Sequence, residues 1–304
     1  MSLIIGTIAF VAAASYITKH YMKPNSIYHD APYKNILRAA ILSSMAYDCP
    51  EDFKETIREF KNNKNANICK LDSTVNIMKE LFTNLDLDLN DNQDIKFISK
   101  KFFDCQLYIL NLNNDIYIVF RGTESVRDFL VDLDVRTHEL DINSGCIHDG
   151  FYRQFNSVYP DIQKHIDSNQ DKNNINISGH SLGGALSQIC SYELMNKYPD
   201  KNIECYTFGS PRVGDQKFIN NIKFKSWRVY NFEDPVPMVP MTKKFMHYND
   251  NCLCLYNNKC DNSPRDYYWM LRPVTSMLLI NFFSPISYHC VDNYINNLED
   301  KIVI

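Results

Sequence analysis

A serine lies in the middle of a glycine-flanked pentapeptide, Gly179-His-Ser181-Leu-Gly183. A β-rich run over residues 175–178 precedes it, and a helical pattern begins at Leu182. Glycines let the incoming strand and the outgoing helix pass close together. A serine on such a tight turn holds its hydroxyl exposed in a strained backbone conformation. The pattern therefore predicts that Ser181 is a nucleophile.

A nucleophilic serine needs a carboxylate to orient its base, because a hydroxyl is a weak nucleophile at neutral pH. In hydrolases with this kind of serine turn, the acid and then the histidine follow the serine along the chain. Asp234 comes directly after the β-rich run 227–232 and is the candidate acid. The adjacent Glu233 is the alternative.

Two histidines follow the serine, and His289 suits the role of base better than His247. His289 stands well beyond the last strand pattern, on a segment long enough to approach the serine from the side. His247 is expected to be a packed or surface residue. His180, next to the nucleophile, is expected to be structural, with its side chain away from the path of attack.

Strand and helix patterns alternate along the chain that must position these residues. The helical patterns cover residues 33–47, 51–60, 150–168 and 182–198, and a short amphipathic helix follows His289. The strand patterns cover residues 102–110, 116–120, 175–178, 203–208 and 227–232, the first two forming a hairpin. The alternation predicts an α/β fold, with a mostly parallel central sheet covered by helices on both faces. Its active site is expected at the carboxyl ends of the strands.

The first 18 residues suggest a membrane anchor. Residues 2–18 form an uncharged stretch, and its length is about the shortest that spans a bilayer. Lys19 and Lys23 follow it. This basic flank places the catalytic domain on the cytoplasmic side. The alternatives are a cleaved signal peptide, hence a secreted protein, and a buried apolar helix. We expect an anchor or signal segment plus linker over residues 1–27, and one catalytic domain over residues 28–304.

Charge and cysteine content exclude some classes of protein. The net charge is −4 and no block of basic residues occurs, so a nucleic-acid partner is not expected. The ten cysteines form no Cys-x-x-Cys pair, which argues against a zinc site. We expect mostly reduced thiols, with a disulfide between Cys252 and Cys260 as the alternative.

Five motifs in one order resemble the class 3 lipase family, the group typified by filamentous-fungal triacylglycerol lipases. The resemblance runs from about residue 116 to residue 240. Besides the serine turn, the segments that carry it are Val119-Phe-Arg-Gly-Thr123, Asp128-Phe-Leu-Val-Asp-Leu133, Ile147-His-Asp-Gly-Phe151, Tyr206 to Asp215 with Phe-Gly-Ser-Pro-Arg-Val-Gly, and Arg228 to Pro237. Residues 252–283 diverge from the family, and so do most of the first 100.

The resemblance implies an α/β-hydrolase fold and further roles for residues of this chain. Backbone N–H groups of Thr123 and Leu182 would form the oxyanion hole. The catalytic histidine of the family comes some fifty residues after its aspartate, where His289 stands, and His247 falls at a noncatalytic position.

Residues 124–140 would form a lid over the site. Its apolar face would carry Val126, Phe129, Leu130, Leu133 and Val135. The alternative is that these residues belong to an ordinary core helix.

These residues predict a serine-dependent lipase that hydrolyses acylglycerols through an acyl-enzyme. The chemistry requires no metal or organic cofactor. The expected partners are a lipid ester and a lipid interface, which the N-terminal segment and the lid would contact. A phospholipase, a mono- or diacylglycerol lipase and a catalytically inactive lipase-like scaffold are the alternatives.

Overall fold

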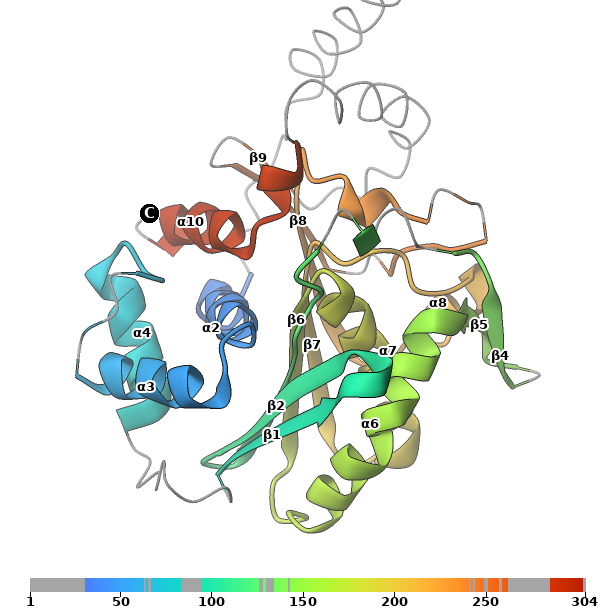
Figure 1. The fold of residues 1–304 in the computed structure, drawn as a ribbon, viewed down its shortest axis with the longest axis horizontal. Helices are drawn as coiled ribbons and strands as arrows, with labels where there is room; N and C mark the ends of the chain where they lie inside the picture. Colours follow the sequence, from blue (N-terminus) through green and yellow to red (C-terminus); the bar gives the residue numbers. More distant parts are fainter. Residues whose placement is uncertain are drawn as a thin grey trace, which may run out of the picture.

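One mixed sheet organises the computed structural model of the chain (Figure 1). The strands lie in the order β1-β2-β3-β6-β7-β8-β9-β10. Their bounds are β1 Ile95–Lys100, β2 Cys105–Leu112, β3 Asp115–Phe120, β6 Asn174–His180, β7 Asn202–Phe208, β8 Lys225–Asn231, β9 Cys252–Tyr256 and β10 Lys259–Asp261. Strands β3, β6, β7, β8 and β9 are parallel, and antiparallel strands border them on both sides. The carboxyl ends of the parallel strands therefore share one edge.

Helices cover both faces of this sheet (Figure 1). One face carries α2 Tyr33–Met45, α3 Pro50–Lys61, α4 Asp72–Thr83 and α10 Val291–Ile302. The other carries α6 Asp149–Asp167, α7 Leu182–Lys197 and α8 Gln216–Asn220. A separate pair, β4 Thr137–Asp141 and β5 Gly145–His148, precedes α6, and short 3₁₀ turns are η1 Lys101–Phe103, η2 Val236–Met238 and η4 Pro285–His289. This arrangement confirms the predicted α/β fold with a mostly parallel sheet.

The structure describes residues 31–62, 64, 67–83, 94–125, 128–129, 134–141, 143–240, 242, 244–248, 251–256, 259–261 and 285–302. Within these residues, no helix is both long and apolar enough to cross a membrane. The predicted N-terminal anchor or signal segment lies outside the described residues.

Helix α3 illustrates why the first helices form where they do. Phe53, Ile57 and Phe60 recur at helical spacing and are fully buried. Pro50 starts the helix, where its missing N–H leaves no hydrogen bond unmade. Acidic residues occupy the first turn and basic residues the last, which complements the helix dipole.

Helix α7 is buried around almost its whole circumference, because it lies between the sheet and α6. Two of its serines therefore need internal partners. The hydroxyl of Ser187 donates to the carbonyl oxygen of Gly183 at 2.8 Å, and that of Ser191 donates to the carbonyl oxygen of Ser187 at 2.8 Å. These bonds satisfy hydroxyls that water cannot reach. The helix that follows Ser181 therefore leaves neither of these hydroxyls unpaired.

The structure adds detail to two predicted segments. The strand expected from residue 102 starts at Cys105, because residues 101–103 form η1 and leave Phe102 92% exposed. The expected lid, residues 124–140, ends in strand β4, whose Thr137 pairs with His148 of β5. Phe129 packs against Phe151, with ring centroids 6.2 Å apart. Val126, Leu130 and Leu133 lie outside the described residues.

The thiols with described surroundings include several that pack as apolar groups. Cys105, Cys190 and Cys205 are buried, and burial raises the pKa of Cys105 and Cys205 to about 12. Such thiols stay protonated and unreactive. The side chain of Cys260 lies outside the described residues, so a disulfide to Cys252 stays an open alternative.

Candidate active site

Ser181 occupies the turn between β6 and α7 with a strained backbone, φ 59° and ψ −128°. A non-glycine residue adopts such a positive φ only where its surroundings enforce it. The N–H of Ser181 donates to the carbonyl oxygen of Phe208 at 2.9 Å, which ties the turn to the end of β7. This is the geometry predicted for the nucleophile.

The glycines beside the serine are required by close backbone approaches. A Cβ atom at position 179 would lie 2.3 Å from the carbonyl carbon and oxygen of Gly183. A Cβ atom at position 183 would lie 2.4 Å from the carbonyl oxygen of Phe120, the last residue of β3. The first turn of α7 is thereby pressed against the ends of β6 and β3.

The structure brings His289 and Asp234 together. Nδ1 of His289 lies 2.7 Å from Oδ2 of Asp234, and both side chains are almost completely buried. The backbone N–H of Val236 donates to Oδ1 of Asp234 at 2.8 Å. Glu233, the alternative acid, faces outward and hydrogen-bonds Tyr288, which raises the pKa of that tyrosine. Asp234 is therefore the carboxylate that orients the imidazole.

The hydrogen bond that Asp234 accepts decides which nitrogen of His289 can act as a base. A carboxylate only accepts hydrogen bonds, so Nδ1 carries the hydrogen and Nε2 is left with a lone pair. Within the described chain, Nε2 of His289 and Oγ of Ser181 are buried and have no hydrogen-bond partner. Both are the atoms that acyl transfer would use.

Gly209 lies directly against the side chains of Asp234 and His289. It follows Phe208 at the end of β7 and has φ 58°. A Cβ atom there would lie 2.7 Å from Oδ2 of Asp234 and 2.9 Å from Cε1 of His289. Because Phe208 is also bonded to the N–H of Ser181, the three predicted residues converge on the carboxyl end of one strand.

The other histidines near this edge have their own partners. Nε2 of His247 lies 2.5 Å from the carbonyl oxygen of Pro237, and burial, assisted by Arg228 and Arg212, holds its pKa well below the usual value. His148 accepts a hydrogen bond from the backbone N–H of Phe151 as the N-cap of α6. Both residues are structural in this arrangement, as expected for His247.

The two predicted oxyanion donors lie on neighbouring backbone segments. Leu182 is the first residue of α7, so its N–H has no acceptor within the helix and lies at the positive end of the helix dipole. Thr123 follows the end of β3, against which α7 starts. It lines a cavity of about 320 Å³ together with Gln106 and Arg121, among others. The guanidinium of Arg121 donates to the side-chain oxygen of Gln106 at 2.8 Å.

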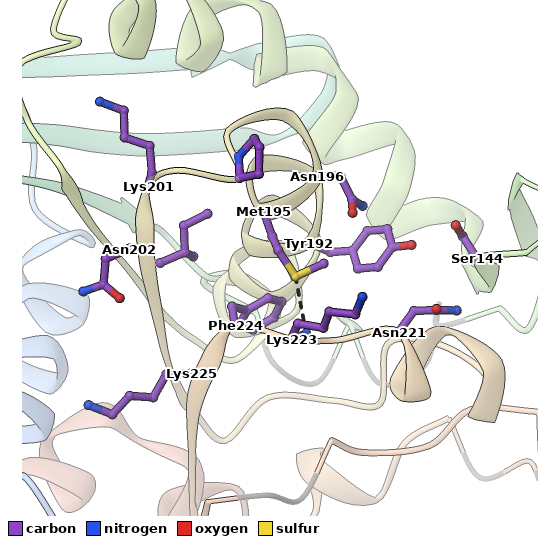
Figure 2. Close-up of a pocket in the computed structure, with 12 residues that line it drawn as sticks. Ser144, Tyr192, Met195, Asn196, Lys201, Asn202, Asn221, Lys223, Phe224 and Lys225 are labelled. Carbon is purple, nitrogen blue, oxygen red and sulfur yellow. Dashed lines mark hydrogen bonds between the residues drawn. The ribbon is translucent and has the colours of Figure 1, made fainter.

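A larger cavity, of about 680 Å³, lies at the other end of the strands (Figure 2). Asn202 and Ile203 of β7 and Lys225 of β8 line it, at the amino ends of these strands. The backbone N–H of Lys223 contacts the sulfur of Met195 at 3.3 Å. Ser181 lies beyond the carboxyl end of β6, so this cavity lies at the opposite end of the strands from Ser181.

Sequence reasoning did not identify Tyr294, Gly209 or Tyr47 as parts of the site. The hydroxyl of Tyr294 donates to Oδ2 of Asp234 and accepts from the backbone N–H of Asn231 at 3.1 Å. Gly209 stood inside a motif but with no role assigned to it. No local pattern marks the two tyrosines, because each reaches the site from a segment distant in sequence, Tyr294 from α10 and Tyr47 from the turn after α2.

The strained serine turn and the Asp–His pair, on a mostly parallel sheet covered on both faces, define the class of α/β-hydrolases. Residues 117–244 match the family model described as "Lipase (class 3)". The match covers less than half of the chain, and over these residues the chain resembles class 3 lipases, as its motifs predicted.

Fungal lipases are among the similar proteins. The chain is 30% identical to secreted mono- and diacylglycerol lipase 1 of Fusarium solani over 138 residues, 43% of this chain and 40% of that protein. It is 33% identical to a lipase of Rhizomucor miehei over 138 residues, 41% of this chain and 37% of that protein. The matched region thus spans about two fifths of each relative.

The likeness in structure is broader than the likeness in sequence. The solved structure of Rhizomucor miehei triacylglyceride lipase superposes with a TM-score of 0.60 at 20% identity, covering 86% of this chain and 95% of that one. At this identity the comparison shows the α/β-hydrolase fold and nothing finer.

Proposed function

We propose that the chain is a serine-dependent carboxylic-ester hydrolase that acts on acylglycerols. The observation that carries this proposal is the Asp234–His289 pair at 2.7 Å, on the same strand end as the strained Ser181 turn. Ester hydrolysis needs a nucleophile, an oriented base and an acid that stabilises the imidazolium. These three side chains supply those parts.

In the proposed mechanism, Nε2 of His289 removes the hydroxyl proton as Oγ of Ser181 attacks the ester carbonyl carbon. The carbonyl oxygen becomes an oxyanion, which the N–H groups of Thr123 and Leu182 bind. The imidazolium then gives its proton to the alcohol as the C–O bond breaks. A water molecule attacks the acyl-enzyme by the same steps, and Asp234 stabilises the imidazolium each time.

Acylglycerols are the proposed substrates because several similar proteins are named lipases and mono- and diacylglycerol lipases. A lipid surface is the proposed partner. Phe102 is 92% exposed in η1, and Phe103 meets it edge to face with ring centroids 5.1 Å apart; Lys100 and Lys101 precede the pair. Exposed aromatic rings next to basic residues favour contact with a lipid–water interface.

The domain boundaries and the location in the cell belong to the same proposal. One hydrolase domain over residues 28–304 is supported by the packing of α2, α3, α4 and α10 against the sheet that carries the site. Residues 1–27 would carry the domain to a membrane or, as the names of several secreted relatives support, out of the cell. Fractionation of the full chain, with detection of its first residues, separates an anchored form from a cleaved one.

The test of the activity is substitution of the nucleophile. Ser181→Ala is expected to lower the kcat for a soluble short-chain ester by about 10⁴-fold or more. Its folded state should survive, because the hydroxyl has no hydrogen-bond partner within the described chain. A fluorophosphonate probe should label the wild type and leave the variant unlabelled. Equal hydrolysis by both proteins would contradict the proposal.

Two further outcomes separate the alternatives. A wild type that neither reacts with the probe nor hydrolyses esters would indicate a lipase-like scaffold. Among active outcomes, release of fatty acid from triacylglycerol, diacylglycerol, monoacylglycerol and phospholipid, compared at equal interface area, identifies the preferred ester. Preference for phospholipid would replace the acylglycerol assignment and leave the chemistry intact.

A further inference from the structure

We propose that Tyr47 and His180 form a hydrogen-bonded strut that joins the oxyanion segment to the backbone of the catalytic base, and that both act as positioning residues. The inference rests on the proposed ester hydrolysis for its kinetic test. The strut itself is a structural statement that can be tested without turnover.

The imidazole of His180 is buried and bonded at both nitrogens. Nε2 lies 2.5 Å from the carbonyl oxygen of His289, and Nδ1 lies 2.9 Å from the hydroxyl oxygen of Tyr47. The rings of His180 and His289 pack against each other with centroids 4.4 Å apart. The ring of His180 thus contacts both the backbone carbonyl and the ring of His289.

The partners of His180 decide its tautomer. A carbonyl oxygen only accepts hydrogen bonds, so Nε2 of His180 carries the hydrogen. Nδ1 is then the acceptor, and Tyr47 donates its hydroxyl hydrogen to it. Burial holds the pKa of His180 well below the usual value, which keeps the imidazole neutral, as this bonding requires.

Tyr47 extends the strut to the oxyanion segment. A Cβ atom at position 122 would lie 2.2 Å from the hydroxyl oxygen of Tyr47, so the hydroxyl fills the space above the backbone of Gly122. Burial raises the pKa of Tyr47 above its usual value, and the Gly122 amide opposes this shift as a hydrogen-bond donor. Gly122 directly precedes Thr123, the proposed oxyanion donor.

Four segments distant in sequence therefore meet in one chain of polar contacts. It runs from Gly122, after β3, to Tyr47, after α2, to His180, at the end of β6, and to His289, at the end of η4. The carbonyl of His289 ends a short helix, where backbone acceptors lack helical partners. His180 supplies the missing donor. Asp234 orients the ring of His289, and the strut fixes the backbone from which that ring extends.

The alternative is that His180 is simply a well-packed core residue. Packing alone predicts that substitutions change stability and leave the turnover of folded protein unchanged. Positioning predicts a lower kcat with nearly the same KM, because the base is misplaced while substrate binding is not. Misplacing a catalytic group by about 1 Å typically costs on the order of 100-fold in rate.

The kinetic test uses a conservative pair of variants on a soluble p-nitrophenyl ester, with rates normalised to the folded fraction. His180→Leu removes the donor to His289 and is expected to lower kcat about 10- to 100-fold, with KM changed less than about 2-fold. His180→Gln keeps an N–H at the position of Nε2 and is expected to recover about 10-fold of that loss. Equal kcat values for the two variants, or for His180→Leu and the wild type, would overturn the strut.

Tyr47→Phe provides a milder variant that removes one oxygen atom. It is expected to lower kcat on its own and to have little additional effect in the His180→Leu background, because both changes break the same chain. Full additivity of the two effects would contradict the proposal. This variant keeps the test available where His180→Leu reduces the yield of folded protein.

A measurement without turnover separates this inference from the proposed function. In wild-type protein labelled with ¹⁵N at histidine, His180 is expected to appear as a neutral ring with the hydrogen on Nε2, and Tyr47→Phe should shift its Nδ1 resonance. A ring with the hydrogen on Nδ1, or no response to Tyr47→Phe, would overturn the strut even in an active enzyme. The expected tautomer in a protein without esterase activity would retain the strut and refute the proposed function.

Discussion

The hydroxyl of Tyr294 donates a hydrogen bond to Oδ2 of Asp234, the same oxygen that faces Nδ1 of His289. Burial, together with the adjacent carboxylate, holds the pKa of Tyr294 well above its usual value, so the hydroxyl remains a donor. Asp234 Oδ1 is bonded in turn to the N–H of Val236. Both oxygens of the carboxylate are thus held in fixed directions inside the protein.

Tyr294→Phe is therefore expected to lower kcat for a soluble ester by about 10- to 150-fold, the value of one hydrogen bond to a charged group. The lost bond leaves the carboxylate of Asp234 less firmly oriented toward His289. Steady-state kinetics provide the measurement. Tyr288→Phe, which alters an exposed tyrosine bonded to Glu233, is the matched control. An equal effect of the two substitutions would refute a specific role for Tyr294.

Gly209→Ala tests whether the close packing of Asp234 and His289 against position 209 is required for activity. The added methyl group would meet Oδ2 of Asp234 and Cε1 of His289 at less than 3 Å, and φ 58° is unfavourable for alanine. Esterase activity is expected to fall at least about 100-fold, and the free energy of unfolding by about 1–3 kcal/mol. Gly150→Ala is the control, because its methyl group would meet only the His148 ring, at 3.2 Å. Activity of the Gly209 variant near that of the control would show that the site tolerates the methyl group.

Buried histidines predict how stability depends on pH. The folded-state pKa of His247 is depressed, by burial first and then by two arginines, while in the unfolded chain it lies near 6.5. Below about pH 6.5 the unfolded state binds a proton that the folded state does not. The stabilisation present above that pH is therefore lost as pH falls, at about 1.4 kcal/mol per pH unit for one such group.

The substitution His247→Gln removes the imidazole that binds this proton in the unfolded state. It keeps a side-chain donor for the carbonyl oxygen of Pro237. Urea unfolding between pH 8 and pH 5 should show a shallower loss of stability in the variant than in the wild type. Above pH 7 the imidazole is neutral in both the folded and the unfolded state. The free energy of unfolding should therefore change with pH in nearly the same way in the two proteins there. Parallel curves across the whole range would contradict the assignment of a neutral, buried His247.

The exposed aromatic pair on η1 provides a test of lipid contact. Phe102→Ser is expected to weaken binding to anionic vesicles about 10-fold, because burying one Phe side chain contributes about 1.5–3 kcal/mol. Hydrolysis of a soluble ester should stay unchanged. Vesicle sedimentation with Ser181→Ala protein measures binding without turnover, and Phe102→Leu, which keeps an apolar side chain, should bind nearly as the wild type does. Unchanged binding of Phe102→Ser would remove η1 from the proposed interface.

Several features followed from the sequence by itself. Strand and helix periodicity predicted β6, β7, β8, α6 and α7, because apolar spacing within one element is a local property. The glycines around Ser181 predicted its tight turn, because that turn depends on side-chain size at neighbouring positions. Chain order after the serine was enough to propose Asp234 and His289, and the five motifs predicted the resemblance to class 3 lipases.

Only the tertiary structure decided how these groups meet. Tyr294 belongs to α10, Tyr47 follows α2 and Gly209 follows β7, and no local pattern marks contacts between segments so distant in sequence. The same holds for the outward direction of Glu233 and for the exposure of Phe102, which a continuous apolar run had placed in a strand. Periodicity specifies which face of an element is buried. The partner buried against that face is decided by the packing of the whole chain.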